Sequence, residues 1–201
     1  MIELSDYDNP FDAIADFENK LATYTGSPYA VATDCCTHAM ELCLRYLKPS
    51  ETITIPYRTY LSVPMLMHKL QLDYEIEEYE WEGRYQLGNT SIWDSARMLY
   101  MDMHHPSQFQ CLSFGRTKPL EIGRGGAILT DNKEAYEWLK KASYDGRDIS
   151  ISPWEDQKEF QVGYHYMMRP DECIDGINGF GNINNAYSHT YPDIRKINIA
   201  S

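Results

Sequence analysis

The segment from Cys111 to Asp131 constrains the fold of this chain more than any other stretch. Its apolar residues predict two strands, one ending at Phe114 and one running from Ala127 to Thr130, because short apolar runs bounded by Gly and Pro are typical of buried strands. The glycine-rich residues between them predict a tight return of the backbone. Lys118 is therefore expected on a loop between two buried strands.

A lysine in such a loop has two interpretations. If close-packed backbone shields it from water, the neutral amine is favoured, and a neutral amine can attack a carbonyl to form a Schiff base. If it is solvated, it is an ordinary loop lysine, which is the simpler interpretation of the lysine alone. Ser113, Thr117 and the glycines that follow, at their spacings, favour the chemical role for Lys118.

Composition limits the class of protein. The chain has 201 residues, of which 43% are hydrophobic, so it can bury one sizeable core, and we expect a single domain over residues 1–201. The formal net charge of −12 argues against nucleic acid and anionic membranes as general partners. A phosphate can still bind to glycine-rich backbone or a helix N-terminus. No apolar stretch approaches the length needed to span a membrane.

The cysteines and the first residues indicate the cellular compartment. The five cysteines are odd in number and lack the spacing of a zinc site, so we expect no metal and a reduced, cytoplasmic protein. The N-terminal residues contain neither a basic region nor a long apolar run, so we expect no signal peptide.

Hydrophobic periodicity and turn residues predict the other elements. Asn9 and Pro10 begin a helix that runs to about Thr25. The remaining expected elements are a strand at 29–33, a helix with Met40, Cys43, Leu44 and Leu47 on one face, strands at 52–55, 72–81 and 90–93, a helix after Asn132, and a helix from Pro170.

The turn Asp34-Cys35-Cys36-Thr37 joins a predicted strand to a predicted helix and is a second candidate site. Such a turn faces the free amides and the positive dipole end of the helix, so an anion can bind there. Thr37 would add a hydroxyl. The alternative is that Thr37 only caps the helix.

The residues around the loop lysine read Ser113-Phe114-x-x-Thr117-Lys118, followed by Gly123-x-Gly125-Gly126 and Thr130. This pattern resembles the cofactor-lysine segment of the DegT/DnrJ/EryC1/StrS sugar aminotransferases, which are pyridoxal 5'-phosphate (PLP) enzymes of the aspartate-aminotransferase, or type I, fold. The resemblance implies that Lys118 is catalytic and binds PLP as a Schiff base, and that Ser113 contributes to the cofactor site. It also implies an α/β fold with a mainly parallel sheet flanked by helices, as in a compact type I large domain.

Three further positions resemble motifs of that family, and they follow one another along the chain in the same order as in the family. Thr37 ends a turn that is Ser-Ser-Gly-Thr in the family and holds the PLP phosphate, with Cys36 in place of the glycine. Tyr60 matches an aromatic residue that stacks on the pyridine ring. Asp94 matches the aspartate that bonds the pyridinium nitrogen and so helps to stabilise the substrate carbanion. Considered alone, Tyr60 could be an ordinary packing tyrosine, and Asp94 could be a carboxylate that caps the turn after a strand. Their order along the chain, with Asp94 between Tyr60 and Lys118, favours cofactor binding.

Two positions depart from the family pattern. Arg97 stands where the family has Gln or His near the phenolic oxygen of the cofactor, and it could stabilise that oxygen or bind an acidic substrate group. The segment Gly163-Tyr164-His165-Tyr166-Met167-Met168 resembles the family's Gly-Tyr-Asn-Tyr-Arg-Met, in which the asparagine reaches the cofactor phosphate of a neighbouring subunit. His165 could donate the same hydrogen bond. The resemblance therefore implies a homodimer with shared active sites.

The resemblance covers residues from about 8 to 180, and residues 181–201 form a short polar tail. Between the acidic strand at 72–81 and Asp94, the family has about one more βα unit, so we expect a narrower sheet here. The chain resembles a short form of the family without its C-terminal small domain.

The function implied is PLP-dependent transfer of an amino group from an amino acid such as glutamate to a keto sugar, with a nucleotide-linked sugar as the expected form. The alternative is a non-catalytic homologue with an interaction or regulatory role, which the replacements at Cys36, Arg97, His165 and Met167 would fit. A PLP-dependent sugar dehydratase is disfavoured by Lys118, because relatives of that kind carry a histidine in its place.

Overall fold

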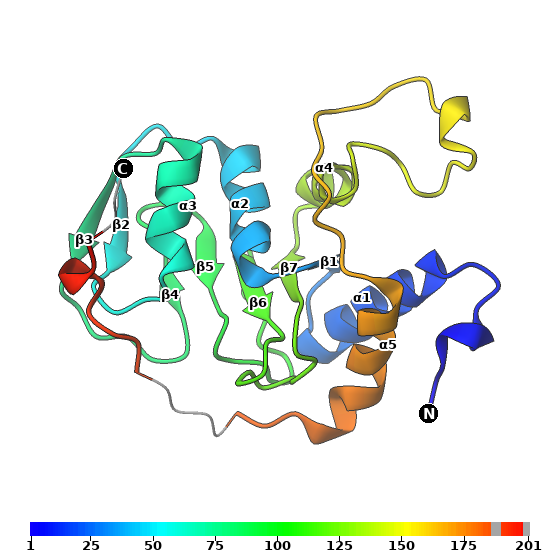
Figure 1. Ribbon diagram of the computed structural model, residues 1–201, viewed down its shortest axis with the longest axis horizontal. Helices are drawn as coiled ribbons and strands as arrows, with labels where there is room; N and C mark the ends of the chain where they lie inside the picture. Colours follow the sequence, from blue (N-terminus) through cyan, green and yellow to red (C-terminus); the bar gives the residue numbers. More distant parts are fainter. Residues whose placement is uncertain (186–189, 199–201) are drawn as a thin grey trace.

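The computed structural model describes residues 1–185 and 190–198 and has an α/β fold in which helices cover both faces of a sheet (Figure 1). One face carries α1 (Phe11–Thr25) and α5 (Pro170–Gly179), and the other carries α2 (Cys36–Leu47), α3 (Ser62–Leu70) and α4 (Lys133–Ser143). The α/β class expected from the sequence is confirmed. Within the two described ranges, no helix combines the length and the apolar character needed to cross a membrane.

The main sheet has five strands in the order β1-β7-β6-β5-β4. Their bounds are Tyr29–Thr33 for β1, Tyr85–Gln86 for β4, Ile92–Asp94 for β5, Phe109–Ser113 for β6 and Gly126–Thr130 for β7. A separate parallel pair is formed by β2 (Ile53–Pro56) and β3 (Tyr74–Glu77). β5 and β6 are also parallel, whereas β1–β7, β6–β7 and β4–β5 are antiparallel.

The main sheet is thus mixed rather than mainly parallel. β7 follows β6 through the glycine-rich lysine loop without an intervening helix, and so direct a return makes the two strands antiparallel. β4 turns directly into β5 in the same way. Parallel pairing is kept where a longer connection precedes the second strand, between β2 and β3 through α3 and between β5 and β6.

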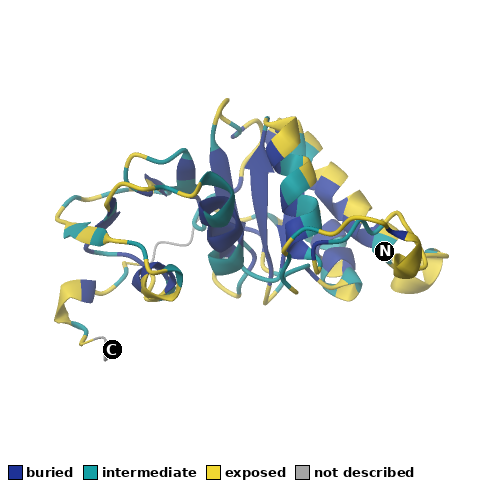
Figure 2. Cartoon of the chain, turned by 90° about the horizontal axis from the view of Figure 1, so that it is seen from above, coloured by how far each residue is buried: buried dark blue, intermediate teal, exposed yellow. Residues whose placement is uncertain are grey.

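Alternate residues of the central strands face two different cores. In β7, Ile128 packs with α2, α3 and α4, while Ala127 and Leu129 pack with α1 and α5. All three are fully buried. Figure 2 shows these buried strands between helices whose outer surfaces are exposed. Burial on both faces explains why the strand reads as a continuous apolar run in the sequence.

β1 lies at the edge of the main sheet, but its outer side is partly covered. The amide of Ala32 donates to the carboxylate of Glu18 over 2.8 Å, and Glu18 also pairs with Lys140 at 2.7 Å. Thr33, the last residue of β1, forms a bridge with Met167. Glu18, which is buried on α1, therefore ties the edge strand to α4.

The β2–β3 pair is joined to the main sheet at the turn after β4. The amide of Gly88 donates to the carbonyl of Thr54 over 2.9 Å. Gly88 has φ +52, and a Cβ there would lie 3.0 Å from the Thr54 nitrogen, so the close approach favours glycine. Among the residues that the structure describes, only the two of β4 pair on this side of β5, which agrees with the narrower sheet expected from the sequence.

Gly126 allows the N-terminus of α2 to pack against the start of β7. A Cβ at this position would lie 2.5 Å from both the Cys35 carbonyl carbon and the Cys36 nitrogen, a distance that no side chain can occupy. The neighbouring Gly125 has φ +116, which also favours glycine. These two glycines fix the beginning of α2 beside the loop that carries Lys118.

Residues 190–198 fold back onto the β2–β3 pair. Ile194 is only 3% exposed, and its amide donates to the carbonyl of Tyr57 over 2.9 Å. Arg195 forms an ion pair with Glu78 at 2.6 Å. This part of the expected polar tail therefore contributes an isoleucine to the core, whereas residues 186–189 and 199–201 lie outside the described residues.

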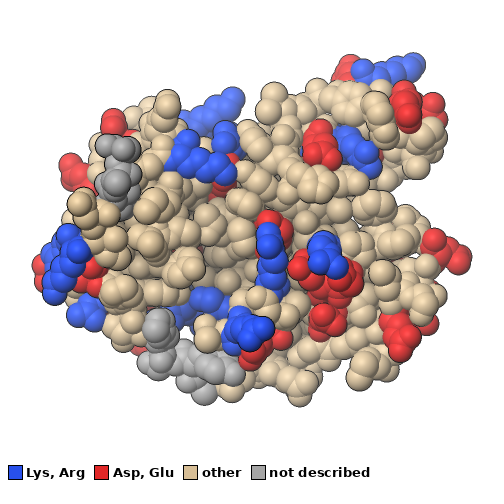
Figure 3. Space-filling model, in the orientation of Figure 1, with Lys and Arg blue, Asp and Glu red and all other residues tan. Residues whose placement is uncertain are grey.

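The charge of the chain is distributed rather than segregated on the face drawn in Figure 3. Lys and Arg side chains lie there in small separate groups, several of them next to Asp or Glu. A nucleic-acid-binding face needs a continuous basic stripe. The described residues on this face form no such stripe.

Candidate active site

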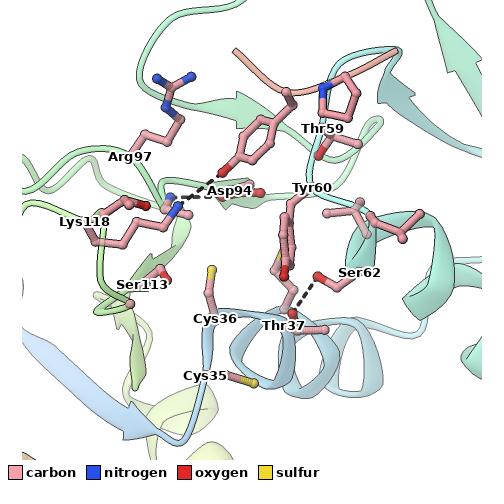
Figure 4. A pocket seen from close by; sticks show the side chains of 18 of the residues that line it. Cys35, Cys36, Thr37, Thr59, Tyr60, Ser62, Asp94, Arg97, Ser113 and Lys118 are labelled. Atoms are coloured by element: carbon pink, nitrogen blue, oxygen red, sulfur yellow. Dashed lines mark hydrogen bonds between the residues drawn. The ribbon is translucent and has the colours of Figure 1, made fainter. Parts of the chain in front are cut away.

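A cavity of about 480 Å³ opens where β5 and β6 end and where α2 and α3 begin (Figure 4). Parallel strands bring their carboxyl ends to the same edge of a sheet, and α/β folds bind ligands there. The cavity brings together all but one of the residues predicted to form the site, namely Cys36, Thr37, Tyr60, Asp94, Arg97, Ser113 and Lys118.

Asp94 is the last residue of β5 and is only 7% exposed. Its Oδ1 accepts a hydrogen bond from the Ala96 amide, and its Oδ2 accepts one from the Tyr85 hydroxyl, each over 2.9 Å. Burial raises the pKa of Asp94, while these two donors and the charges of Lys118 and Arg97 oppose the rise. The two donors also fix the direction in which the carboxylate points.

Tyr85 and Thr59 lie behind Asp94 and are buried as well. The Tyr85 hydroxyl is 2.6 Å from Oγ1 of Thr59. Because the single hydroxyl proton of Tyr85 goes to Asp94, Thr59 must be the donor in this second bond. Burial, and then the charge of Asp94, raise the pKa of Tyr85 well above its usual range, so Tyr85 remains a donor at neutral pH.

Lys118 lies on the loop that returns from β6 to β7. Its amide donates to the carbonyl of Gly115 over 3.1 Å, and two amides of the glycine-rich return donate to the carbonyl of Phe114. The side-chain Nζ donates to the Tyr191 hydroxyl over 3.1 Å. In Figure 4 the amine extends into the cavity on the side of Asp94. The loop expected from the sequence is therefore present, and its lysine faces the candidate site.

The N-termini of α2 and α3 meet at another end of the cavity. Oγ1 of Thr37 and Oγ of Ser62, both in the first turns of their helices, are 2.7 Å apart. The Cys36 thiol extends toward the same space (Figure 4). Burial, and then the charge of Asp94, raise the pKa of Cys36, so the thiol is neutral. Two hydroxyls and a neutral thiol beside free helix amides can accommodate an anion.

Asp34 does not bring its negative charge into the cavity. Its carboxylate pairs with His38 at 2.6 Å and with Arg124 at 2.8 Å. Although burial disfavours the charged imidazole, the hydrogen bond to Asp34 raises the pKa of His38 to about 9. Asp34, Cys35 and His38 are close enough to share a metal ion. In this arrangement Asp34 already binds two cationic groups, and a metal ion would have to displace the imidazole proton.

Tyr60 and Arg97 lie on different sides of the cavity in Figure 4. Tyr60 is 59% exposed, and its ring stands beside Thr37 and Ser62. The guanidinium carbon of Arg97 lies 5.7 Å from the centre of the Trp81 ring and 5.6 Å from that of Tyr191. Arg97 is thus held among aromatic rings at the edge of the cavity.

His165 is the predicted site residue that stands apart from the others. Its side chain is 78% exposed, and Nδ1 is 3.3 Å from Oδ2 of Asp145. Its backbone forms a bridge with Tyr144, at the end of α4. His165 does not line the cavity of its own chain, so a role in an active site would require a second chain.

Three residues of the site were missed by sequence reasoning. Ser62 is the first residue of α3, after the N-cap Leu61, and it could have been proposed because it lies only two residues after Tyr60. Tyr85 lies in β4, between the strands expected at 72–81 and 90–93, where the sequence predicts no element. Tyr191 lies in the polar tail, far along the chain from Lys118. No local pattern signals either of the last two contacts.

The sequence profile of the DegT/DnrJ/EryC1/StrS aminotransferase family matches residues 5–71 and 103–180. The chain belongs to this family. The matched parts include the lysine loop, the turn before α2 and the segment around His165. Residues 72–102 are unmatched, and they contain the region in which one βα unit was expected to be missing, together with Asp94. No curated protein sequence matches the chain.

Several solved structures share the fold, among them two described as aminotransferases. AtS13 from Actinomadura melliaura is 16% identical with a TM-score of 0.70, over 84% of this chain and 59% of the other. The sugar aminotransferase CalS13 from Micromonospora echinospora is 12% identical with a TM-score of 0.67, over 84% and 60%. A putative PLP-dependent aminotransferase from Bacillus cereus is 14% identical with a TM-score of 0.69, over 90% and 64%. The expected fold of a PLP-dependent transferase is confirmed, and this chain spans about three fifths of the length of these proteins.

Proposed function

We propose that this chain is a PLP-dependent aminotransferase that moves an amino group from an amino acid such as glutamate to a keto sugar carried on a nucleotide. The observation that carries the proposal is the convergence of Lys118 and Asp94 in one cavity with the N-terminus of α2. Membership of an aminotransferase family supports the reaction class, and the likeness to a sugar aminotransferase supports the substrate class. The donor, the sugar, the nucleotide and a cytoplasmic location are parts of this proposal.

The donor set of the cavity fits PLP. The aldehyde of PLP would need an amine, which Lys118 offers. The ring nitrogen of PLP would need a fixed hydrogen-bond acceptor, which Asp94 offers. A phosphate needs donors, which the first turn of α2 and the hydroxyls of Thr37 and Ser62 offer. The replacements in the turn do not prevent this, because Asp34 is paired outside the cavity and the Cys36 thiol is neutral.

Bound PLP would supply an electron sink that stabilises the carbanion formed when a proton leaves the substrate carbon. Nζ of Lys118 would hold the cofactor aldehyde and then carry that proton as general base and general acid. Asp94 would accept the N–H of the ring nitrogen and so keep it protonated. Tyr60 would lie against the ring, and Ser113, at the end of β6, would line the phosphate side.

Arg97 gives the cavity a cation that can bind an acidic group of the substrate. The rings of Trp81 and Tyr191 beside it restrict the guanidinium and shield part of it from water. An ion pair strengthens when its partners are desolvated. We therefore assign Arg97 to the carboxylate of the amino donor or to a phosphate of the sugar nucleotide, in preference to the phenolic oxygen of PLP.

The working unit in this proposal is a homodimer in which His165 reaches the partner's phosphate site. His165 is exposed and can donate a hydrogen bond. The segment before it projects from the body of the chain in Figure 1 and carries two exposed aromatic residues, Trp154 and Phe160, each about half exposed. Exposed apolar side chains of this kind are typical of contact surfaces.

A non-catalytic homologue is the second candidate, and we do not favour it. A chain that had lost its chemistry would have no need to keep a lysine, a buried carboxylate and the hydroxyl chain behind that carboxylate in one cavity. The replaced residues are Cys36 in the turn before α2, Arg97, His165 and Met167, and none of these replacements removes a group that the transfer of the proton requires.

The test is borohydride reduction of the protein after incubation with PLP, followed by peptide mass mapping. The pyridoxyl group is expected on Lys118, with loss of visible absorbance on reduction. Lys118→Arg is the control, because it keeps the charge but cannot form the bond. A label on Lys140 or Lys141 instead, or no label, would refute the proposal.

A further inference from the structure

The part of the chain that follows the family match reaches the candidate active site. Residues 190–198 lie beyond residue 180, where the match ends, and Tyr191, Pro192 and Ile197 line the cavity. We propose that Tyr191 is a positioning residue of this site, whose hydroxyl holds the amine of Lys118 in place for proton transfer. This inference rests on the proposed function, because it is there that the amine does chemistry.

The contact between the two side chains is direct. Nζ of Lys118 donates to Oη of Tyr191 over 3.1 Å, and the same nitrogen lies 5.9 Å from the centre of the ring. A phenolic oxygen accepts a hydrogen bond from an ammonium group, and the phenolic O–H can donate to a neutral amine. Tyr191 can therefore hold Lys118 in both protonation states through which a general acid and base passes.

The ring of Tyr191 is itself restricted by its neighbours. It stacks on Trp81 with the ring centres 6.1 Å apart and the planes inclined by 25°, and the ring centre of Tyr60 lies 6.0 Å away. Trp81 is fixed in turn, since its Nε1 donates to the carbonyl of Arg58 over 2.7 Å. The guanidinium of Arg97 lies 5.6 Å from the centre of the Tyr191 ring. The hydroxyl is thus carried on a ring with few alternative positions.

The backbone that carries Tyr191 is anchored two and three residues further along. Asp193 forms a bridge with Arg58, and Ile194 is buried, with its amide bonded to the carbonyl of Tyr57. These contacts attach the segment to the β2 side of the cavity, whereas Lys118 belongs to the loop between β6 and β7. Tyr191 therefore connects two walls of the cavity that come from different parts of the chain.

The first experiment measures the reactivity of Lys118 in the cofactor-free protein. Reductive methylation with formaldehyde and cyanoborohydride, read by peptide mass mapping, gives the rate at Lys118 relative to the exposed Lys133. Tyr191→Phe keeps the ring and removes the hydroxyl, so the amine loses its acceptor and the relative rate is expected to rise about twofold to tenfold, the range that one net hydrogen bond corresponds to. An unchanged rate would overturn the inference.

Two further variants separate the hydroxyl from general effects. Tyr100→Phe removes a hydroxyl from an exposed tyrosine and is expected to leave the rate at Lys118 unchanged. Ile194→Ala keeps the Tyr191 hydroxyl but weakens the packing that anchors its segment, so the methylation rate at Lys118 should rise, as it does in Tyr191→Phe. Circular dichroism would show that this variant remains folded. A wild-type rate in a folded Ile194→Ala protein would contradict the anchoring step.

The PLP-loaded protein provides a second readout and separates this inference from the proposed function. The pH dependence of its visible absorbance is expected to shift in Tyr191→Phe and to stay unchanged in Tyr100→Phe. If PLP attaches to Lys118 in all of these proteins and neither readout differs, Tyr191 only packs against the lysine, and the proposed function stands without it. If PLP attaches to no residue, the proposed function fails. The methylation rates in the cofactor-free protein would still show whether the Tyr191 hydroxyl holds the amine of Lys118.

Discussion

The hydroxyl of Tyr85 lies 2.9 Å from Oδ2 of Asp94, and Thr59 lies 2.6 Å behind that hydroxyl. The three side chains form a directional chain of hydrogen bonds in which each hydroxyl donates toward the carboxylate. All three are buried, so water cannot readily replace a donor that is lost. The direction of the Asp94 carboxylate in the cavity therefore depends on Tyr85, which does not itself line the cavity.

Tyr85→Phe should slow the reaction of the PLP-loaded protein with an amino donor. A hydrogen bond to a charged group contributes about 1.5–3 kcal/mol, which corresponds to a loss of roughly tenfold to a hundredfold in rate if the bond matters in the transition state. The measurement is single-turnover loss of the PLP absorbance on addition of glutamate. Tyr100→Phe serves as the matched control. Equal rates in the two variants would show that Tyr85 does not support Asp94.

Asp94→Ala and Asp94→Asn should lose activity much more than they lose stability. Asparagine keeps the shape of the side chain and can still accept from Tyr85, but it cannot balance a protonated ring nitrogen. We expect Asp94→Asn to fold with a free energy of unfolding within about 2 kcal/mol of the wild-type value, while the single-turnover rate falls by at least about a hundredfold. An Asp94→Asn protein that reacts with the donor at the wild-type rate would remove Asp94 from the site.

The Asp34–His38 pair should make stability depend on pH. The pKa of His38 is about 9 in the folded chain and about 6.5 in an unfolded one, so the pair stabilises the fold fully below pH 6.5 and this contribution is lost as the pH rises through 9. Asp34, whose pKa is lowered despite its burial, stays ionised throughout this window. Urea unfolding should show a decrease of at most about 3 kcal/mol between pH 6.5 and 9.5.

The control for this pH dependence of the free energy of unfolding is His38→Asn, in which the charged partner of Asp34 is absent. The difference in free energy of unfolding between wild type and His38→Asn should shrink as the pH rises through this window, and a constant difference would show that the His38 charge does not stabilise the fold. Arg124 keeps its own pairing with Asp34 in this variant, so the turn before α2 retains one of its two ion pairs.

Mixing Lys118→Ala with His165→Ala chains should restore activity if the active sites are shared. In a two-fold hybrid dimer, one site contains both lesions and the other contains neither. After random exchange, half of the dimers are hybrids with one intact site, so about a quarter of the wild-type activity is expected. Mass spectrometry of differently tagged chains would establish the exchange. Exchange without recovered activity would argue that His165 does not serve the neighbouring site.

The sequence predicted most of the elements because their patterns are local. The helix at 11–25 and the strand at 126–130 follow from hydrophobic spacing and from the glycines beside them. The lysine loop and the turn before α2 could be located for the same reason. The pattern could not reveal that the main sheet is mixed, because strand direction depends on which strands become neighbours and not on their own residues.

The contacts that hold the site residues in place were harder to foresee. β4 has only two residues, which is too short for any periodicity, so the hydrogen bond from Tyr85 to Asp94 had no signal. Tyr191 follows a stretch without apolar repeats, and only the burial of Ile194 shows why that segment returns to the cavity. The ion pairs of Asp34 with His38 and Arg124 had no local signal either, because Arg124 lies 90 residues further along the chain.

The carboxylate of Glu18 has a consequence for how copies of this chain behave when they are concentrated. An edge strand with unpaired amides invites the strand of another molecule to add to it, which is how native sheets begin to aggregate. In this chain the Ala32 amide already donates to the buried Glu18, and a partly buried ion pair with Lys140 holds the carboxylate in place. An incoming strand would have to displace a charged group from the interior before it could pair, so β1 is protected against strand addition by a side chain far from the cavity.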